Sequence, residues 1–178
     1  MHRTLFRAFA IGLAAILLAA CSSAVKPCPN AAVLADASSF TAFPNGAPSP
    51  DPAHALYTVQ MTGATTDCDY DKKFKSSDSS LDLSFRVSRT PNGLPVDASV
   101  PYFVAVTGEG GKILTREKFT VAFHLDAGET TTTFEDKVAA VHIDVARDKY
   151  PWDYQLLAGL ELTKAQLDYN RTVGPYAP

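Results

Sequence analysis

Two histidine–aspartate pairs are the residues of this chain whose types and spacing come closest to metal chemistry. Asp126 follows His124 by two positions, and Asp144 follows His142 in the same way. Both histidines stand between apolar residues, so each is expected on the polar face of a strand. Two such imidazoles on neighbouring strands, with an aspartate as third ligand, would suit zinc. Solvent-facing strand histidines are far commoner than metal ligands, and we therefore predict neither a metal nor any other cofactor.

An acidic run, Asp67-Cys68-Asp69-Tyr70-Asp71, is similar to the opening of a calcium-binding loop. Asp78 stands at the twelfth position, where such a loop provides its last ligand. However, Lys72 occupies the place where the loop needs glycine for its sharp turn, and two more lysines bring positive charge close by. We therefore interpret the polar stretch 72–80 as a solvated, mobile loop and not as a calcium site.

The remaining carboxylates give no catalytic constellation. The chain contains no nucleophile elbow, zinc-protease helix, phosphate-binding loop or dinucleotide fingerprint. Five glutamates are spread along the chain, and their spacing gives no reason to pair any two as general acid and base. They are Glu109, Glu117, Glu129, Glu135 and Glu161. We therefore predict a protein that is not an enzyme.

Three aromatic residues, Tyr150, Trp152 and Tyr154, stand at alternate positions beside a proline. Tyr and Trp are favoured at interfaces, so the three rings could form a recognition patch. The other interpretation, which we favour, is that they plug one end of a β-sheet structure.

The chain holds three cysteines, an odd number, and two of them stand close together in the stretch 17–30, LLAACSSAVKPCPN. This stretch ends an N-terminal segment with a basic start and an apolar run over 8–20. Such a run is too short to cross a bilayer as a permanent helix, which needs about 20 apolar residues. The basic start, the apolar run and the small residues before a cut site are typical of a secretory signal peptide.

The sequence Leu18-Ala19-Ala20-Cys21 resembles the lipobox of bacterial lipoprotein precursors at all four positions. The resemblance implies that the Cys21 thiol is joined to diacylglycerol and that residues 1–20 are cut away. It also implies that the new amino group of Cys21 is acylated. Ser22 follows the modified residue, and in enterobacteria this favours the outer membrane over the inner one.

With Cys21 lipidated, Cys28 and Cys68 remain as an even pair in an exported chain. Export places them in an oxidising compartment, where disulfides persist. A bridge between them would close a loop of roughly 40 residues and contribute about 4 kcal/mol in the chain-entropy model. A redox or metal role is the competing interpretation, but the chain has no CxxC motif and no histidine near either cysteine. The lipidated tether 21–27 would span about 20 Å at most, so the domain should lie near the lipid surface.

The charge of the chain limits its partners. Removing the leader takes away Arg3 and Arg7, so the formal net charge moves from −3 to −5. This acidity argues against nucleic acid, whose phosphates need clustered Lys and Arg. It also argues against electrostatic adhesion to anionic headgroups, so membrane attachment is expected through the lipid on Cys21.

The body of the chain alternates with a period of two, which is typical of strands with one buried face. The clearest case is 81–88, where four apolar residues alternate with four polar ones. The stretch 100–107 is almost continuously apolar, as expected of a strand covered on both faces. Further strands are expected at 57–62, 112–125, 141–145 and 154–162.

Turn and cap signals separate these strands. Glycine-containing stretches at 108–111 and 126–129 predict turns, the first closing a hairpin, and 89–95 contains an Asn-Gly signal. The proline-rich stretch 44–52 is expected to be a loop. The segment 30–40 fits either an edge strand or a helical turn. Thr163 and Gln166 form a capping box, which predicts a short helix over 164–171.

These elements indicate a mainly β fold, namely an antiparallel β-sandwich of about seven strands with a short C-terminal helix, as one domain over 28–178. The strand spacing resembles immunoglobulin-like or fibronectin-type domains in architecture alone, which implies no function. Trp152 lies well beyond Cys68, so the tryptophan between the two cysteines of an antibody domain has no counterpart. A small closed barrel is the alternative fold.

Together these features favour an envelope lipoprotein that presents a β-sandwich to the periplasm as a binding or scaffolding module. The leader resembles those of many small lipoproteins of Gram-negative proteobacteria. The expected partners are membrane lipid, through acylated Cys21, and an envelope protein. One alternative is a hydrolase or metal-dependent enzyme acting on envelope material, which needs two of the histidines or carboxylates above in one pocket. Another is carriage of a small apolar ligand, which needs an internal cavity.

Overall fold

The clearest alternating stretch, 81–88, forms the second part of strand β4 (Ser76–Ser88) in the computed structural model. Its four apolar residues are at most 1% exposed, and the residues between them are exposed or half-buried. The period of two therefore gives this strand one face toward a core and one toward solvent. The structure describes residues 27–44, 46, 48, 52–91 and 93–174.

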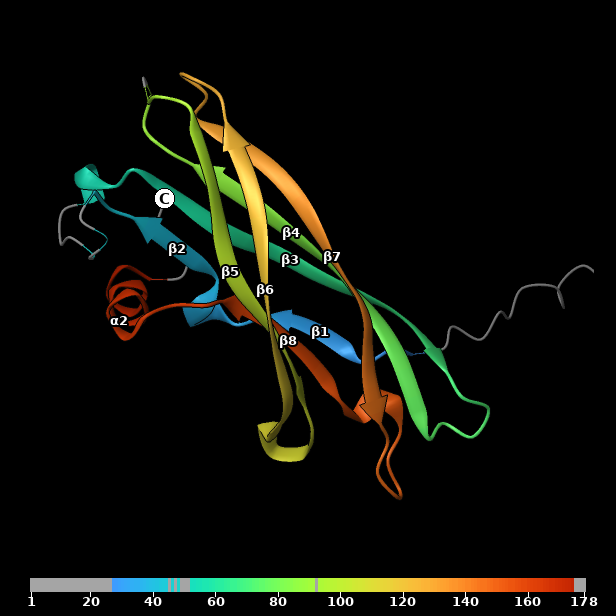
Figure 1. The fold of residues 1–178 in the computed structure, drawn as a ribbon. Coiled ribbons are helices and arrows are strands. Elements are labelled where there is room, and N and C mark those ends of the chain that lie inside the picture. The colour runs from blue at the N-terminus through green and yellow to red at the C-terminus, as the bar shows by residue number, and fades with distance from the viewer. Residues whose placement is uncertain (1–26, 45, 47, 49–51, 92, 175–178) are drawn as a thin grey trace, which may run out of the picture.

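The strands of the described chain form two four-stranded sheets that pack face to face (Figure 1). The first sheet has the order β1–β8–β5–β6 and the second the order β2–β3–β4–β7. β1 runs parallel to β8, and every other neighbouring pair is antiparallel. The other strands are β1 (Asn30–Val33), β2 (Ser39–Ala42), β3 (Tyr57–Tyr70), β5 (Val96–Thr107), β6 (Ile113–Leu125), β7 (Thr131–Asp144) and β8 (Gln155–Leu160).

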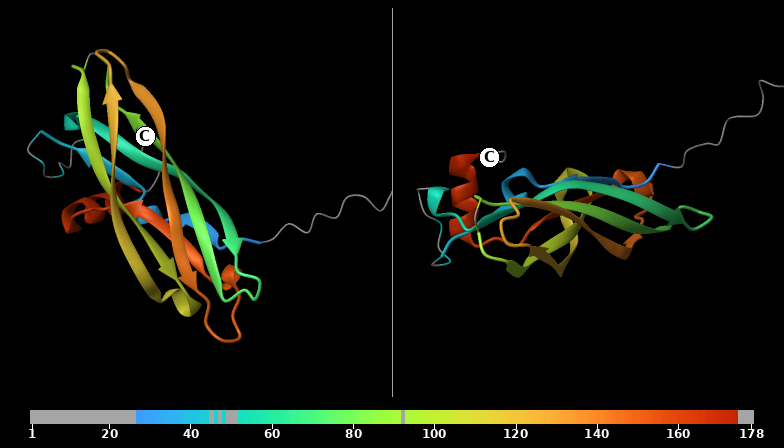
Figure 2. Two further views of the ribbon diagram at one scale, coloured as in Figure 1. Left: turned by 45° about the vertical axis from the view of Figure 1, so that its right-hand side comes forward. Right: turned by 90° about the horizontal axis from the view of Figure 1, so that it is seen from above.

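This arrangement confirms the mainly β fold and the sandwich, with eight strands where about seven were expected. β6 and β7 are edge strands of different sheets, and Phe123 of β6 stacks on Phe134 of β7 at a centroid distance of 5.8 Å. The described strands of the two edges nevertheless belong to separate hydrogen-bonded sheets. The fold is therefore a sandwich and not a closed barrel, and Figure 2 shows its elongated shape from two further sides.

Aliphatic and aromatic side chains from both sheets fill the core. Phe85 of β4 lies against Tyr102 of β5 and stacks on Phe134 at 5.1 Å. The Tyr102 hydroxyl donates a hydrogen bond of 2.8 Å to the Asp136 carboxylate of β7. Burial, and then the bond to Asp136, raise the pKa of Tyr102. The side chains between the sheets thus include packed rings and the hydrogen-bonded pair of Tyr102 and Asp136.

Two strands extend well beyond the apolar stretches that predicted them. β3 continues to Tyr70 and β4 begins at Ser76, so the loop predicted at 72–80 is wrong for residues 76–80. Ser77 and Ser79 are buried, and their hydroxyls lie 3.4 Å apart. Small hydroxyl side chains therefore occupy inward positions of this strand, where a search for alternating apolar residues finds no signal. β7 likewise begins ten residues before the predicted stretch 141–145.

The segment 30–40, which fitted either an edge strand or a helical turn, contains both. β1 and β2 are edge strands of opposite sheets, joined by the 3-10 turn η1 (Ala35–Ala37). In the predicted loop 44–52, residues 45, 47 and 49–51 lie outside the described residues, and η2 (Pro52–His54) follows them. Asn92 of the Asn-Gly signal also lies outside the described residues.

Both glycine-containing turns are confirmed. The 3-10 turn η3 (Glu109–Gly111) joins β5 to β6 in an antiparallel hairpin. Gly128 has a φ of +76° between β6 and β7, a left-handed conformation that glycine adopts without steric cost.

The C-terminal helix α2 (Lys164–Val173) begins at the predicted capping box and ends two residues later than predicted. Thr163 accepts the Gln166 N–H at 3.3 Å, and the Gln166 side chain accepts the Thr163 N–H at 2.8 Å. The buried amide of Asn170 donates to the carbonyl oxygens of Asp36 (3.0 Å) and Ser39 (2.7 Å). These two bonds fix α2 against η1 and the start of β2.

Candidate functional site

The described chain enters the sandwich at the end where β3 turns into β4. The sulfur atoms of Cys28 and Cys68 are joined, and their Cα atoms are 5.7 Å apart, a normal separation for a disulfide. Cys28 lies two residues before β1, and Cys68 lies two residues before the end of β3. Thr66 adds a second link, because its hydroxyl donates to the Pro29 carbonyl at 2.9 Å. The start of the described chain is thus fixed to this end (blue in Figure 1).

The turn between β3 and β4 presents Phe74 at the tip of the same end. The Asp71 carboxylate accepts the backbone N–H groups of Lys73 at 3.2 Å and Ser76 at 3.0 Å, and also that of Lys75. The bond from Ser76 is the largest cause of the lowered pKa of Asp71. Phe74 has a φ of +54°, a left-handed conformation that is costly for a bulky residue. The turn therefore holds an exposed phenyl ring in a position that Asn or Gly would occupy more easily.

Phe74 belongs to a cluster of four aromatic side chains, which we call the aromatic end. Its members are Tyr70, Phe74, Tyr150 and Trp152. Tyr150 and Trp152 flank the start of the 3-10 turn η4 (Pro151–Asp153) and stack at 4.8 Å. The ring of Phe74 lies 5.7 Å from that of Trp152 and 6.4 Å from that of Tyr150, and Tyr70 lies 6.3 Å from Trp152. Phe74, Tyr150 and Trp152 are 36%, 49% and 36% exposed, so the cluster forms an apolar surface.

Two of the three aromatic residues singled out from the sequence lie in the aromatic end, and the third does not. Tyr154 is 5% exposed, belongs to the core, and accepts the Ala146 N–H on its hydroxyl at 2.8 Å. Asp153 accepts the Tyr150 N–H at 2.8 Å, which orders η4 and directs Tyr150 and Trp152 outward. The two interpretations of this segment therefore apply to different residues. Tyr154 packs into the core of the sandwich, whereas Tyr150 and Trp152 form an exposed patch.

Sequence reasoning missed Tyr70 and Phe74. The one signal for Phe74 was a single aromatic residue among lysines and serines. Tyr70 is half-buried, and its hydroxyl oxygen is buried without a hydrogen-bond partner in the described structure. Burial raises the pKa of Tyr70. A buried unpaired hydroxyl costs about 1–3 kcal/mol, so the Tyr70 hydroxyl lowers the free energy of unfolding.

A depression of about 430 Å³ adjoins the aromatic end, between the β5–β6 turn and the segment after β7. Glu109 and Asp144 both line it, and their side chains are 83% and 95% exposed. Lys149 lies 2.9 Å from the Glu109 carboxylate and lowers its pKa. A general acid at neutral pH needs a raised pKa, so Glu109 does not suit that role.

His124 is held by two aspartates on the first sheet. Its Nδ1 lies 2.6 Å from Asp97, the residue opposite it on β5, and its Nε2 lies 3.2 Å from Asp126. The hydrogen bond to Asp97, followed by that to Asp126, raises the pKa of His124. Both ring nitrogens are therefore engaged by carboxylates.

His142 has the same surroundings on the other sheet. Its Nδ1 lies 2.7 Å from Asp78, its cross-strand neighbour on β4, and its Nε2 lies 3.3 Å from Asp144. The bond to Asp78 is the larger cause of its raised pKa. The two histidines lie on different sheets with separate partners, so the structure does not bring them together. Within the described residues, no group of three or more His, Cys, Asp or Glu side chains could hold a metal ion.

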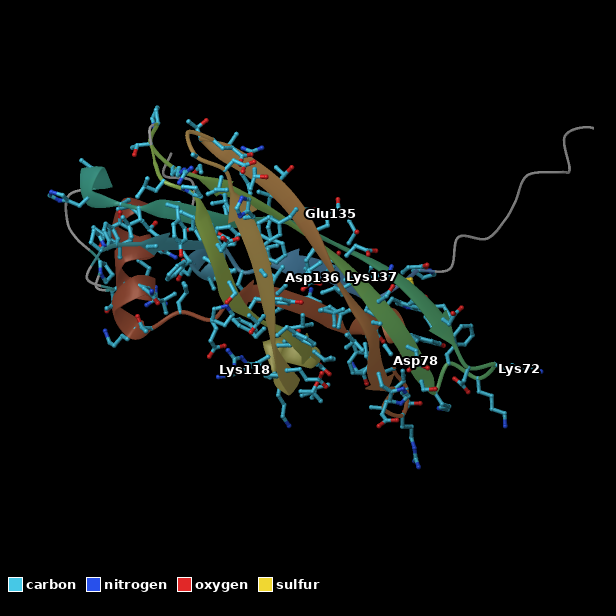
Figure 3. All side chains as sticks on the ribbon, turned by 45° about the horizontal axis from the view of Figure 1, so that its top comes forward. Lys72, Asp78, Lys118, Glu135, Asp136 and Lys137 are labelled. Carbon is cyan, nitrogen blue, oxygen red and sulfur yellow. A yellow bond between two sulfur atoms is a disulfide. The ribbon has the colours of Figure 1, made fainter. Side chains whose placement is uncertain are left out.

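The acidic run at 67–71 forms a strand and a turn, not a calcium loop. Residues 67–70 belong to β3, where consecutive side chains point to opposite faces, and Asp71 is used by the backbone of the turn. The glutamates are likewise dispersed: Glu161 pairs with Arg116 and with Lys118 at 2.9 Å, and Glu129 accepts the Asp126 N–H at 2.9 Å. Figure 3 shows Lys72, Lys118 and Glu135 at separate places on the surface.

A second concave surface lies away from the aromatic end, between α2, η1 and the outer face of the first sheet. This α2 groove has a volume of about 450 Å³. Arg171 lies 2.8 Å from Asp36, and Arg116 pairs with Glu161 while its guanidinium lies 4.1 Å from the ring centre of Phe103. The charges at the rim are therefore paired with one another. The apolar lining residues are Leu34, Ala35, Ala37, Phe103, Leu160, Leu162 and Leu167.

No protein-family model, curated protein or solved structure matches this chain. Among the described helices, none has the length and apolar character needed to cross a membrane.

Proposed function

We propose that this chain is an envelope lipoprotein that holds one β-sandwich at a membrane surface as a binding or scaffolding module, without catalytic activity of its own. The lipobox-like sequence that ends at Cys21 supports the anchor. Lipidation at Cys21 places the domain in the periplasm, and Ser22 favours the outer membrane. The protein partner is expected to be another component of the envelope.

The observation that carries this proposal is where the described chain starts relative to the α2 groove. The disulfide fixes Cys28 to the end of β3, and only Ser22 to Pro27 separate it from Cys21. Six residues span at most about 20 Å when extended. Helix α2 lies at the opposite end of the elongated sandwich in Figures 1 and 2. A sandwich anchored in this way presents the α2 groove away from the lipid.

The α2 groove suits an apolar side chain of a protein partner better than a charged ligand. Its floor is apolar, and both arginines at its rim are already paired with carboxylates. Its volume of about 450 Å³ lies in the range of pockets that enclose a small ligand or a few side chains. Apolar anchor residues in such pockets supply most of the affinity in protein interfaces.

Photo-crosslinking in living cells tests this proposal. A photoreactive amino acid at Leu162, in the α2 groove, should give a reproducible adduct with one envelope protein. The matched control is the same amino acid at Leu94, which is 82% exposed and lies in the β4–β5 connection, outside the groove. The proposal is contradicted if Leu162 gives no protein adduct in several growth conditions, or if both positions give the same products.

A further inference from the structure

We infer that the aromatic end is the surface by which the anchored sandwich rests on the bilayer, with its rings at the level of the lipid headgroups. The inference rests on the proposed anchor at Cys21 and names the partner of the aromatic end. That partner is the interface between lipid and water.

The aromatic end lies beside the point where the chain is attached. Cys68 precedes Tyr70 by two residues of strand, a rise of roughly 7 Å. Asn30, two residues after Cys28, pairs with Gln155, which follows Trp152 by three residues. Both segments that carry the aromatic end therefore adjoin the disulfide. A tether of at most about 20 Å leaves this end within reach of the surface in which Cys21 is anchored.

The exposed rings have the chemistry of an interfacial patch. Tyr and Trp concentrate where membranes meet water, because each has an apolar ring and a polar group that remains hydrated. Tyr150 and Trp152 stack in parallel, and Phe74 stands beside them at the tip of the turn. Phe74 keeps its ring exposed in a left-handed backbone conformation that disfavours it. Contact with lipid would explain why the Phe74 ring is exposed on an unfavourable backbone conformation.

Lysines surround Phe74 on the β3–β4 turn. Lys72, Lys73 and Lys75 are all exposed, and Figure 3 shows Lys72 at the tip. The one acidic residue of the turn, Asp71, has its carboxylate occupied by backbone N–H groups. Long lysine side chains can reach lipid phosphates while a neighbouring ring lies deeper. The turn thus differs from the chain as a whole, whose negative net charge would be repelled by anionic lipid.

Trp152 reports on this contact because it is the chain's single tryptophan. In a chain produced without the leader and without lipidation, starting at Cys21 and with Cys28 and Cys68 bonded, Cys21 provides the one free thiol. This thiol can be coupled to a maleimide-bearing lipid in vesicles. The vesicles contain phosphatidylethanolamine and phosphatidylglycerol, with bromine on acyl carbons near the headgroup. Bromine quenches tryptophan at short range, and a tryptophan at the level of the headgroups lies close to the brominated carbons. The inference therefore predicts that Trp152 emission falls relative to unbrominated vesicles. Unchanged emission in the coupled protein would overturn the inference.

Phe74→Asn and Leu94→Asn form a matched pair of variants. Asn suits the left-handed backbone at position 74, so folding is retained while the ring is removed, and quenching of Trp152 should fall. Leu94 is an exposed apolar residue outside the aromatic end, so its variant should be quenched like the parent protein. Equal quenching of the two variants contradicts the inference.

Failure of the inference and failure of the proposed anchor give different results. Because coupling to the lipid is chemical, quenching of Trp152 is measured whether or not cells modify Cys21. An unmodified Cys21 in the native protein counts against the anchor, and an unquenched Trp152 in the coupled protein counts against the lipid contact. A photo-crosslinker at Phe74 that captures a protein in native membranes, and no lipid, would assign the aromatic end to a protein partner and overturn the inference.

Discussion

Two tyrosines near the aromatic end differ in whether their hydroxyl groups are satisfied. The Tyr154 hydroxyl accepts the Ala146 N–H, whereas the buried Tyr70 hydroxyl oxygen has no partner in the described structure. A buried polar group costs free energy when it is unpaired and little when it is bonded. The two positions therefore respond in opposite ways to removal of the hydroxyl.

Tyr70→Phe is predicted to leave the free energy of unfolding unchanged or to raise it by up to about 1 kcal/mol, because it removes an unpaired hydroxyl. Tyr154→Phe is predicted to lower it by about 1 kcal/mol, because the Ala146 N–H loses its acceptor. Urea denaturation of both variants checks the pair. Destabilisation of Tyr70→Phe by as much as Tyr154→Phe would show that the Tyr70 hydroxyl has a partner.

The two histidines are predicted to make stability depend on pH. Their neighbouring aspartates raise the pKa of each imidazole in the folded protein above the unfolded value of about 6.5. Protonated histidines therefore stabilise the fold below about pH 6.5, and this contribution is lost as the pH rises through the raised pKa. The difference in unfolding free energy between the parent protein and a His124→Gln, His142→Gln variant should be larger at about pH 5.5 than at about pH 8.5.

Asp97→Asn separates the two histidine sites, since it removes the main partner of His124 alone. In an NMR titration of the imidazole protons, the midpoint of His124 should move down toward its ordinary value and that of His142 should stay in place. Movement of both midpoints, or of neither, would contradict the assignment of separate aspartate partners.

Single residues were predictable where their role depends on the chain nearby. The capping box of Thr163 and Gln166 is an example, because all its contacts lie within one turn of helix. The pairs His124–Asp126 and His142–Asp144 could be read from the sequence, because their members are two positions apart. The cross-strand partners Asp97 and Asp78 were not predictable, because they reach the histidines through the pairing of strands distant in sequence. Phe74 was missed for the same reason, since its aromatic neighbours at 150 and 152 come from another connection.

At the scale of elements, the disulfide connects the start of the described chain to β3 across 40 positions of sequence. Replacing both cysteines, in a Cys28→Ser, Cys68→Ser variant, is predicted to lower the free energy of unfolding by about 3–4 kcal/mol, because the unfolded chain gains the entropy of a large loop. Guanidinium denaturation measures the change. A Cys28→Ser, Cys68→Ser variant as stable as the parent protein would contradict the predicted contribution of the disulfide.

Thr66→Val removes the neighbouring hydrogen bond to the Pro29 carbonyl. It should lower the free energy of unfolding by about 1 kcal/mol.

The stretches that were recognised as strands keep one parity of burial. Apolar residues point inward at every second position over 81–87 of β4, 100–106 of β5 and 119–125 of β6. β3 changes register between Met61 and Gly63, and the predicted stretch 57–62 ends at this bulge. β7 contains Ala140 at a φ of +57°, opposite a register shift in β4. Each bulge reverses which side chains face the core, so a search for strict alternation found only one part of each strand.

At the scale of the whole molecule, the two surfaces have different proposed roles. We assign lipid contact to the aromatic end and protein binding to the α2 groove. The aromatic end adjoins the disulfide near the start of the described chain. Helix α2, which lines the α2 groove, lies at the opposite end of the sandwich (Figure 1). The sequence indicated a lipid anchor, a short tether and a sandwich. It could not indicate which connections gather at which end, because that depends on strand order and on the packing of two sheets.

The lipid anchor at Cys21 is tested by the intact mass of the chain extracted from the membranes of the cells that make it. We predict a chain that starts at Cys21 and carries the added mass of a diacylglycerol and an acyl group, with Cys28 and Cys68 oxidised. A chain that retains residues 1–20, or one that starts at Cys21 with an unmodified thiol, would contradict it.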